Sequence, residues 1–164
     1  MKNIILLLFI CSAFAGFSQK KLAKLLKQQN TESIPYISVD SLYQIQNEVI
    51  LLDSREEKEF KTSHLKDAIC VGYDHFNLEN TINQLPDKNV KIVVYCSLGI
   101  RSEDIAEKLK KAGYTNVLNL YGGIFEWKNN DLEVLNSKEI PTDSIHTFSA
   151  SWSKWLKKGI KVYD

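Results

Sequence analysis

Short apolar runs alternate with amphipathic stretches through the middle of the chain. The apolar runs predict strands at residues 37–39, 49–52, 68–71, 91–95 and 117–120. Apolar residues at helical spacing predict helices between them, after Asp40, up to Phe60, over residues 78–85 and from Ser102 to Gly113. Short strands that alternate with helices favour an α/β fold, in which a parallel sheet is covered by helices on both faces. We expect this domain to occupy residues 37–130.

The segment before this domain, residues 19–36, begins with a basic stretch. Lys20–Gln29 places three leucines on one side of a short helix, and such a short helix is marginal alone. We therefore expect a linker, or a helix that packs on the protein, rather than a membrane-binding helix.

The segment after the domain, residues 131–164, is a C-terminal extension that is polar as far as Asp143. Apolar residues then return with the spacing of an amphipathic helix that Gly159 would end, at Phe148, Trp152, Trp155 and Leu156. Aromatic residues at helical spacing usually belong to a core, so we expect this face to pack on the domain. Binding of a protein partner through the extension is the alternative.

Residues 1–18 have the pattern of a secretory signal peptide. Lys2 precedes an uncharged run, residues 4–17, which is shorter than the roughly 20 residues of a membrane-spanning helix. Cleavage after Ala15 or Ser18 fits this pattern, and a retained anchor is the alternative. We expect an exported, periplasmic protein that is not embedded in the membrane after cleavage.

Composition narrows the possible functions. The 164 residues are 25% charged and 44% hydrophobic, with a net charge of +1, which is typical of one globular domain. Because this balance offers no excess of cations, we expect no nucleic-acid partner. Three cysteines and three widely separated histidines provide neither a disulfide framework nor a local metal motif, so we expect no metal.

Cys96 is the residue best placed for chemistry, since it follows a predicted strand and precedes a predicted helix. Residues 96–102 combine amides that can converge on one point, the positive end of a helix and the guanidinium of Arg101, all of which favour a thiolate. Gly99 permits a backbone conformation that side chains disfavour. Two acidic residues in the first turn of the helix, Glu103 and Asp104, partly oppose this field. The alternative is a small buried cysteine at the end of a strand.

Three ordered motifs resemble the rhodanese-like (sulfurtransferase) domain family. The first is the loop Cys-x-x-Gly-x-Arg-Ser at residues 96–102. The other two are similar to the Asp-x-Arg…Glu-Phe…His segment and to the closing segment of that family, and lie at residues 52–69 and 113–127. The resemblance covers about residues 37–130 and implies the family's three-layer, parallel-sheet fold.

The resemblance implies transfer of sulfane sulfur without a cofactor. In that family, a cysteine thiolate attacks a small sulfur-containing donor such as thiosulfate, holds the sulfur as a persulfide and passes it to a thiol or cyanide acceptor. On this chain it makes Cys96 the nucleophile and Arg101 the residue that holds the loop and its charge. The amides that cradle the sulfur would belong to Ser97, Leu98, Gly99, Ile100 and Arg101.

The resemblance also implies roles for residues around the loop. Ser102 would cap the following helix or hydrogen-bond the sulfur. Asp53 and Arg55 would fix the surroundings of the loop. Ser97 and Leu98 stand where thiosulfate-using members often carry basic residues, which leaves the donor open.

Other chemistries fit the sequence less well. Four residues separate Cys96 from Arg101, one fewer than in the phosphatase and arsenate reductase relatives of the family, and the smaller ring favours sulfur. A thioredoxin-like protein would need a second cysteine within residues 97–99, and Cys70 is expected to be a buried strand residue. The alternative from a different class is a noncatalytic module that binds another exported protein.

Overall fold

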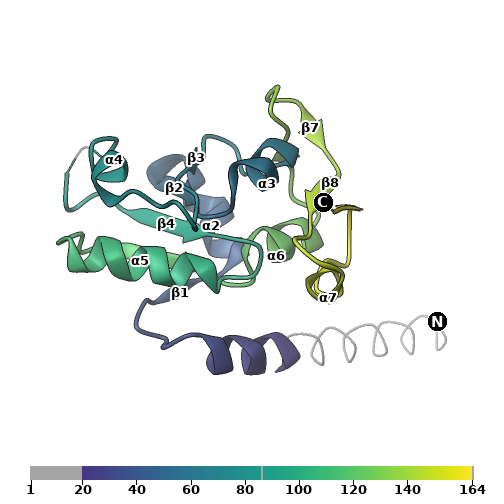
Figure 1. Ribbon diagram of the computed structural model, residues 1–164, viewed down its shortest axis with the longest axis horizontal. Coiled ribbons are helices and arrows are strands. Elements are labelled where there is room, and N and C mark those ends of the chain that lie inside the picture. Colours follow the sequence, from purple (N-terminus) through teal and green to yellow (C-terminus); the bar gives the residue numbers. More distant parts are fainter. Residues whose placement is uncertain (1–19, 86, 164) are drawn as a thin grey trace, which may run out of the picture. The chain divides into compact units, whose positions relative to one another are not determined.

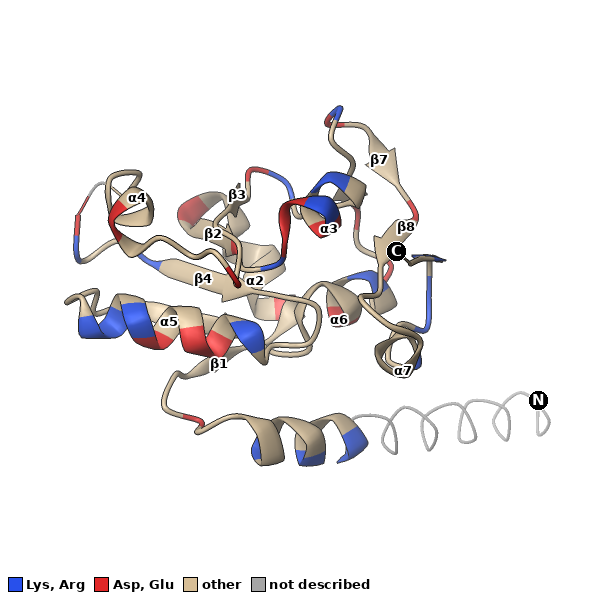
Figure 2. Cartoon of the chain, viewed as in Figure 1, with Lys and Arg blue, Asp and Glu red and all other residues tan. Residues whose placement is uncertain are grey.

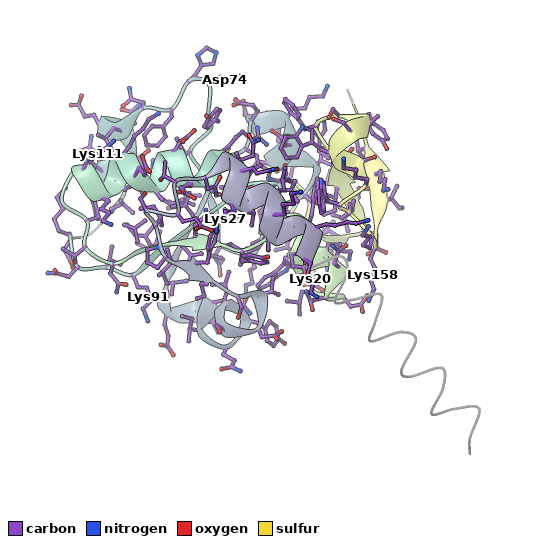
Figure 3. All side chains as sticks on the ribbon, turned by 90° about the horizontal axis from the view of Figure 1, so that it is seen from below. Lys20, Lys27, Asp74, Lys91, Lys111 and Lys158 are labelled. Atoms are coloured by element: carbon purple, nitrogen blue, oxygen red, sulfur yellow. The ribbon has the colours of Figure 1, made fainter. Side chains whose placement is uncertain are left out.

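The computed structural model describes residues 20–85 and 87–163, and these divide into two compact units between residues 31 and 32. In the first unit, residues 20–29 are helical, as expected, and the exposed Lys20 and Lys27 lie along this helix (Figure 3). The expected signal peptide lies outside the described residues. Within the described ranges, no helix is both long and apolar enough to cross a bilayer.

The second unit is built on a five-stranded parallel sheet with the order β1-β5-β4-β2-β3 (Figure 1). The strands are β1 (Tyr36–Ile37), β2 (Ile50–Asp53), β3 (Ile69–Cys70), β4 (Ile92–Tyr95) and β5 (Val117–Leu120). The central position of β4 places its carboxyl end, and the loop that follows, between the ends of β2 and β5.

Helices connect the strands and cover the sheet (Figure 1). They are α2 (Val39–Ile45) with the 3-10 turn η1 (Gln46–Glu48), α3 (Glu57–Thr62), α4 (Leu78–Ile82), α5 (Arg101–Lys111) and α6 (Gly123–Asn129). On one face of the sheet, Ile92 and Val94 belong to the same buried cluster as Ile105 of α5. The neighbouring Leu51 and Val93 are equally buried and point to the opposite face, because side chains alternate along a strand. Both faces are therefore covered, which confirms the α/β fold.

Helix α5 is the helix that begins at the Cys96 loop. Its first turn carries acidic residues and its last turn carries lysines, a distribution that complements the helix dipole (Figure 2). Ile105 and Leu109 are buried, whereas Ala112 is half-buried.

Two local predictions are wrong. Strand β1 ends at Ile37 because Ser38, not Asp40, caps α2: the Ser38 side chain accepts a hydrogen bond from the Ser41 amide at 3.2 Å. The seven-residue helix α6 begins at Gly123, in a segment for which the sequence predicted no element.

The C-terminal extension differs most from expectation. Its polar first part pairs β6 (Val134–Leu135) with β7 (Pro141–Thr142), and β8 (Ser144–His146) pairs in parallel with β9 (Ile160–Val162). The expected amphipathic helix is reduced to the four residues of α7 (Ala150–Ser153). Phe148 cannot be part of it, because its backbone is left-handed, with φ of 62°. β8 packs against α3, so the extension is joined to the same unit as the sheet.

Candidate functional site

Cys96 lies directly after β4 and its side chain is buried, with 2% of its surface exposed. The amide of Gly99 donates a hydrogen bond to Cys96 Sγ at 3.1 Å. Gly99 has φ of 98°, and a Cβ added there would stand 3.0 Å from the Leu120 carbonyl oxygen. The loop can turn its amide onto the sulfur because this position has no side chain. Contacts of the other loop amides with a sulfur bound to Cys96 stay a prediction.

Asn119 of β5 fixes the loop from the neighbouring strand. Its Nδ2 donates to the Gly99 carbonyl oxygen at 2.9 Å, and its Oδ1 accepts from the Ser102 hydroxyl at 2.7 Å. The same hydroxyl lies 3.6 Å from Cys96 Sγ. Ser102 therefore contacts the sulfur, and its expected alternative as a helix cap is wrong, because α5 begins at Arg101 with Ile100 as its N-cap.

Arg101 pairs with Glu59 of α3. Two parallel hydrogen bonds of 2.8 Å join its guanidinium to the Glu59 carboxylate, which is itself 2% exposed. The guanidinium also donates to the Ser97 hydroxyl at 3.3 Å. Arg101 thus ties the start of α5 to α3, which agrees with the expected role of holding the loop.

The opposite charges of Arg101 and Glu59 each stabilise the ionised form of the other residue. Burial alone would raise the pKa of Glu59, but hydrogen bonds from Arg101 and the charges of Arg101 and Arg55 hold it below its ordinary value. Burial alone would lower the pKa of Arg101, but its hydrogen bond with Glu59 and nearby negative charges raise it. Both groups stay ionised at neutral pH, so most of the positive charge of Arg101 is already balanced.

Helix α6 holds the loop from behind. The Ile124 amide donates to the Cys96 carbonyl oxygen at 2.9 Å, and the Phe125 amide donates to that of Ser97 at 3.2 Å. Gly123 makes this approach possible, because a Cβ there would lie 2.2 Å from the Cys96 carbonyl oxygen.

Asp53 and Arg55 lie beside the end of β4, and their expected role of fixing the surroundings of the loop stays a prediction. They form a fully buried ion pair of 2.6 Å, and Arg55 also donates to the Ser63 carbonyl oxygen. The guanidinium lies 5.8 Å from the ring centre of Tyr95, the residue before Cys96. Ser54 adds two hydrogen bonds to the Tyr95 carbonyl oxygen, so this segment fixes the end of β4.

A cavity of about 190 Å³ opens beside Cys96. Leu98 and Ile100 of the loop form one part of its wall, together with Ser97 and Arg101. The C-terminal extension supplies the rest, with the rings of Phe148 and Trp152. Cys96, Ser97, Leu98, Ile100 and Arg101 of the predicted loop therefore line one apolar cavity, which Gly99 and Ser102 do not reach.

His64 is buried and packs against Phe60. Its ring stacks on Phe60, and its nitrogens lie 3.0 Å from the Phe60 carbonyl oxygen and 3.1 Å from a Glu139 carboxylate oxygen. Nowhere in the described part of the chain do three or more metal-ligating side chains gather as a metal would require.

Cys70 is a free, half-buried thiol on β3. Burial raises its pKa to about 11, and the charge of Asp53 adds to this effect. The thiolate of Cys70 therefore forms only as the pH rises toward that value. We expect iodoacetamide to label Cys70 about 100-fold more slowly than a free cysteine at pH 8, because only the thiolate reacts.

Peptide-level mass spectrometry across pH 7 to 10 measures this rate, and labelling in urea is the control that restores ordinary reactivity. If folded Cys70 reacted at pH 8 like a free cysteine, the environment described above would be incorrect and Cys70 would qualify as a resolving thiol.

The sequence did not place three residues at the site, namely Glu59, Asn119 and Phe148. Glu59 stood in a motif without a partner, since 42 residues separate it from Arg101. Asn119 could have been singled out from the sequence, because it is a lone amide side chain within an apolar strand. Phe148 was assigned to a helix face, and nothing local indicated its place beside Cys96.

Comparisons with known proteins agree with this geometry. A family model described as the rhodanese-like domain matches residues 38–130. The chain is 36% identical over 85 residues to the tRNA uridine(34) hydroxylase of Aster yellows witches'-broom phytoplasma, covering 50% of this chain and 28% of that protein. It is 38% identical over 96 residues to the adenylyltransferase and sulfurtransferase UBA4 of Candida albicans, covering 56% and 22%.

A solved structure shows the same relation. The rhodanese-related protein of Thermoplasma volcanium matches with a TM-score of 0.55 and 26% identity, covering 62% of this chain and 97% of that chain. The match to the two curated relatives spans only about a quarter of their lengths, so it concerns one domain of each. The family model covers more than half of this chain, including the Cys96 loop and strands β2 to β5 of the sheet, while β1 lies just before the matched residues. The chain belongs to the rhodanese-like domain family.

Proposed function

We propose that the protein is a sulfurtransferase that carries sulfane sulfur as a persulfide on Cys96. The observation that carries this proposal is the hydrogen bond from the Gly99 amide to Cys96 Sγ, in a loop that leads into the N-terminus of α5. An amide donor and a helix N-terminus stabilise a sulfur anion without an added base or cofactor.

The proposed reaction has two steps. The Cys96 thiolate attacks the outer sulfur of a donor, a new S–S bond forms, and the bond from that sulfur to the rest of the donor breaks with its electron pair on the leaving group. The negative charge then lies on the terminal sulfur of the persulfide, which occupies the cavity. A thiol acceptor, as its thiolate, attacks this terminal sulfur and releases the Cys96 thiolate.

The surrounding residues serve both steps by position. The Gly99 amide donates to Sγ and so stabilises negative charge there. Asn119 accepts the single proton of the Ser102 hydroxyl and donates to the Gly99 carbonyl oxygen, which fixes both residues beside the sulfur. The Arg101–Glu59 pair holds the loop between α3 and α5.

The decisive measurement is the intact mass of the purified protein after incubation with thiosulfate and, separately, with other sulfane donors. We expect a gain of one sulfur atom that a reductant removes, and no gain in Cys96→Ser, since the Ser97 and Ser102 hydroxyls cannot replace the thiolate. Cys70→Ser is the matched control and is expected to retain the adduct.

If no donor gave an adduct on the wild-type protein, the transferase proposal would fail. The noncatalytic module would then take its place, and a pull-down with and without the C-terminal extension would search for its protein partner.

We also propose export to the periplasm, which the pattern of residues 1–18 supports. The same intact mass tests it on protein recovered from producing cells. Loss of residues 1–15 or 1–18 is expected, and retention of the whole segment would favour an anchor.

A further inference from the structure

The cavity beside Cys96 has a wall that the family match does not include. Phe148 and Trp152 lie in the C-terminal extension, beyond the matched residues 38–130. A wall contributed by a separate segment can select donors without changing the loop that carries the chemistry. What it selects follows from its shape and charge.

The turn that carries Phe148 is held in place on both sides. Ile145 and His146 of β8 are buried, and the Phe148 amide donates to His146 Nδ1 at 3.2 Å. On the other side, Trp152 lies in α7, whose first turn is closed by the bond from the Ser153 amide to the Ser149 carbonyl oxygen. The turn is therefore built by the fold and is more than a loose tail.

Phe148 adopts a left-handed backbone, with φ of 62°, which is unfavourable for a bulky residue. Its ring remains 54% exposed, so burial of the ring does not offset this strain. The ring instead lies 5.3 Å from the guanidinium carbon of Arg101 and lines the cavity. Strain that places an exposed aromatic ring at a reactive cysteine indicates a binding role.

The charge of the cavity argues against a divalent donor. Of the described residues that line it, only Arg101 is charged, and Glu59 occupies its guanidinium through two 2.8 Å hydrogen bonds. Phe148 covers that guanidinium further. Thiosulfate carries two charges and would have to give up water here without gaining an unpaired cation in exchange.

The size and lining of the cavity suit an aromatic body. An apolar cavity of roughly 150 Å³ accommodates benzene, and this one measures about 190 Å³. The rings of Phe148 and Trp152 and the side chains of Leu98 and Ile100 offer contacts to a ring. A ligand with a single negative charge on its sulfur-bearing end has less hydration to lose in this cavity than thiosulfate with its two charges.

We propose that Phe148 and Trp152 make the site specific for organic sulfane donors, which have an apolar body and one negative charge, such as aryl thiosulfonates, over thiosulfate. This inference rests on the proposed sulfur transfer. With an aryl thiosulfonate, the Cys96 thiolate bonds to the outer sulfur, the bond between that sulfur and the sulfonyl sulfur breaks, and its electron pair leaves with an aryl sulfinate. The total charge is conserved, and no oxidant or reductant is consumed.

The test compares the second-order rate constants of persulfide formation with benzenethiosulfonate and thiosulfate, followed by intact mass. For the wild type we expect benzenethiosulfonate to react at least tenfold faster. We expect Phe148→Ala, and separately Trp152→Leu, to slow benzenethiosulfonate about tenfold, which corresponds to roughly one lost aromatic contact. The rate with thiosulfate should stay within about threefold.

Tyr163→Ala is the matched control, because Tyr163 is another exposed aromatic residue of the extension that does not line the cavity. It is expected to leave both rates unchanged. Equal rates with both donors in the wild type, or an equal loss of both rates in the two cavity variants, would overturn the specificity proposal while leaving the transferase proposal standing. Absence of an adduct from every donor would overturn both.

Discussion

Gly123→Ala is expected to disable the Cys96 loop while the sheet remains folded. A Cβ at this position would lie 2.2 Å from the Cys96 carbonyl oxygen and 2.7 Å from the carbonyl carbon of Ser97, so backbone must move. The shift would break the hydrogen bonds from the Ile124 and Phe125 amides, which hold the loop on α6. Misplacing a nucleophile by about 1 Å costs about 100-fold in rate, and we expect persulfide formation to fall by that factor.

The same substitution should lower stability by roughly 3 kcal/mol. This figure combines backbone strain at a left-handed position with two weakened hydrogen bonds. Urea unfolding measures the loss, and intact mass measures the rate on protein that is still folded.

Gly113→Ala is the control that separates the effect of the steric clash at Gly123 from that of left-handed backbone strain. Gly113 has φ of 95°, also left-handed, but a Cβ there would meet no atom within 4 Å. We expect a loss of about 1 kcal/mol and an unchanged rate of persulfide formation. Equal effects of the two alanine substitutions on the rate would show that α6 does not position the loop.

The sheet was predictable from the sequence because its strands are buried on both faces. Such strands appear as continuous apolar runs, as in residues 49–52 and 91–95, and the structure places β2 and β4 there. The ends of strands were less predictable. At β1 a single hydroxyl decides the end, because the Ser38 side chain caps α2. No helix was predicted after residues 117–120, although α6 begins at Gly123, because a left-handed glycine pair resembles a chain reversal locally.

The candidate site likewise has a part that could be predicted from the sequence and a part that could not. Cys96, Gly99 and Arg101 lie in one continuous loop, so their proximity could be predicted. The partners that fix them lie on other elements, Glu59 on α3 and Asn119 on β5, and no sequence spacing encodes those contacts. The same limit applies to the C-terminal extension, where the parallel pairing of β8 with β9 joins the segments on either side of the predicted helix.

Asp53→Asn is expected to lower the stability of the fold more than Gly123→Ala does. Asp53 and Arg55 are both 0% exposed, and the carboxylate pairs with the guanidinium through contacts of 2.6 to 3.2 Å. Among the described residues, no hydrogen-bond partner meets the third guanidinium nitrogen, Nη1, which is also buried. Removing the carboxylate charge would leave a buried cation without its counterion, which costs about 3 to 5 kcal/mol.

The comparison of single and double variants identifies the cause of that loss. In Asp53→Asn with Arg55→Met, the uncompensated charge is gone, so the double variant should be more stable than the sum of the two single losses predicts. Glu57→Gln, which breaks the exposed Lys61–Glu57 pair, should leave the urea midpoint unchanged. If Asp53→Asn cost less than about 1 kcal/mol, the charge of Glu59, which also acts on Arg55, would be the main counterion under the loop. Because Arg55 of this pair also contacts Tyr95, the residue before Cys96, we expect Asp53→Asn to slow persulfide formation as well as to lower stability. If the uncompensated charge causes both losses, both should be smaller in the double variant than the two single variants predict.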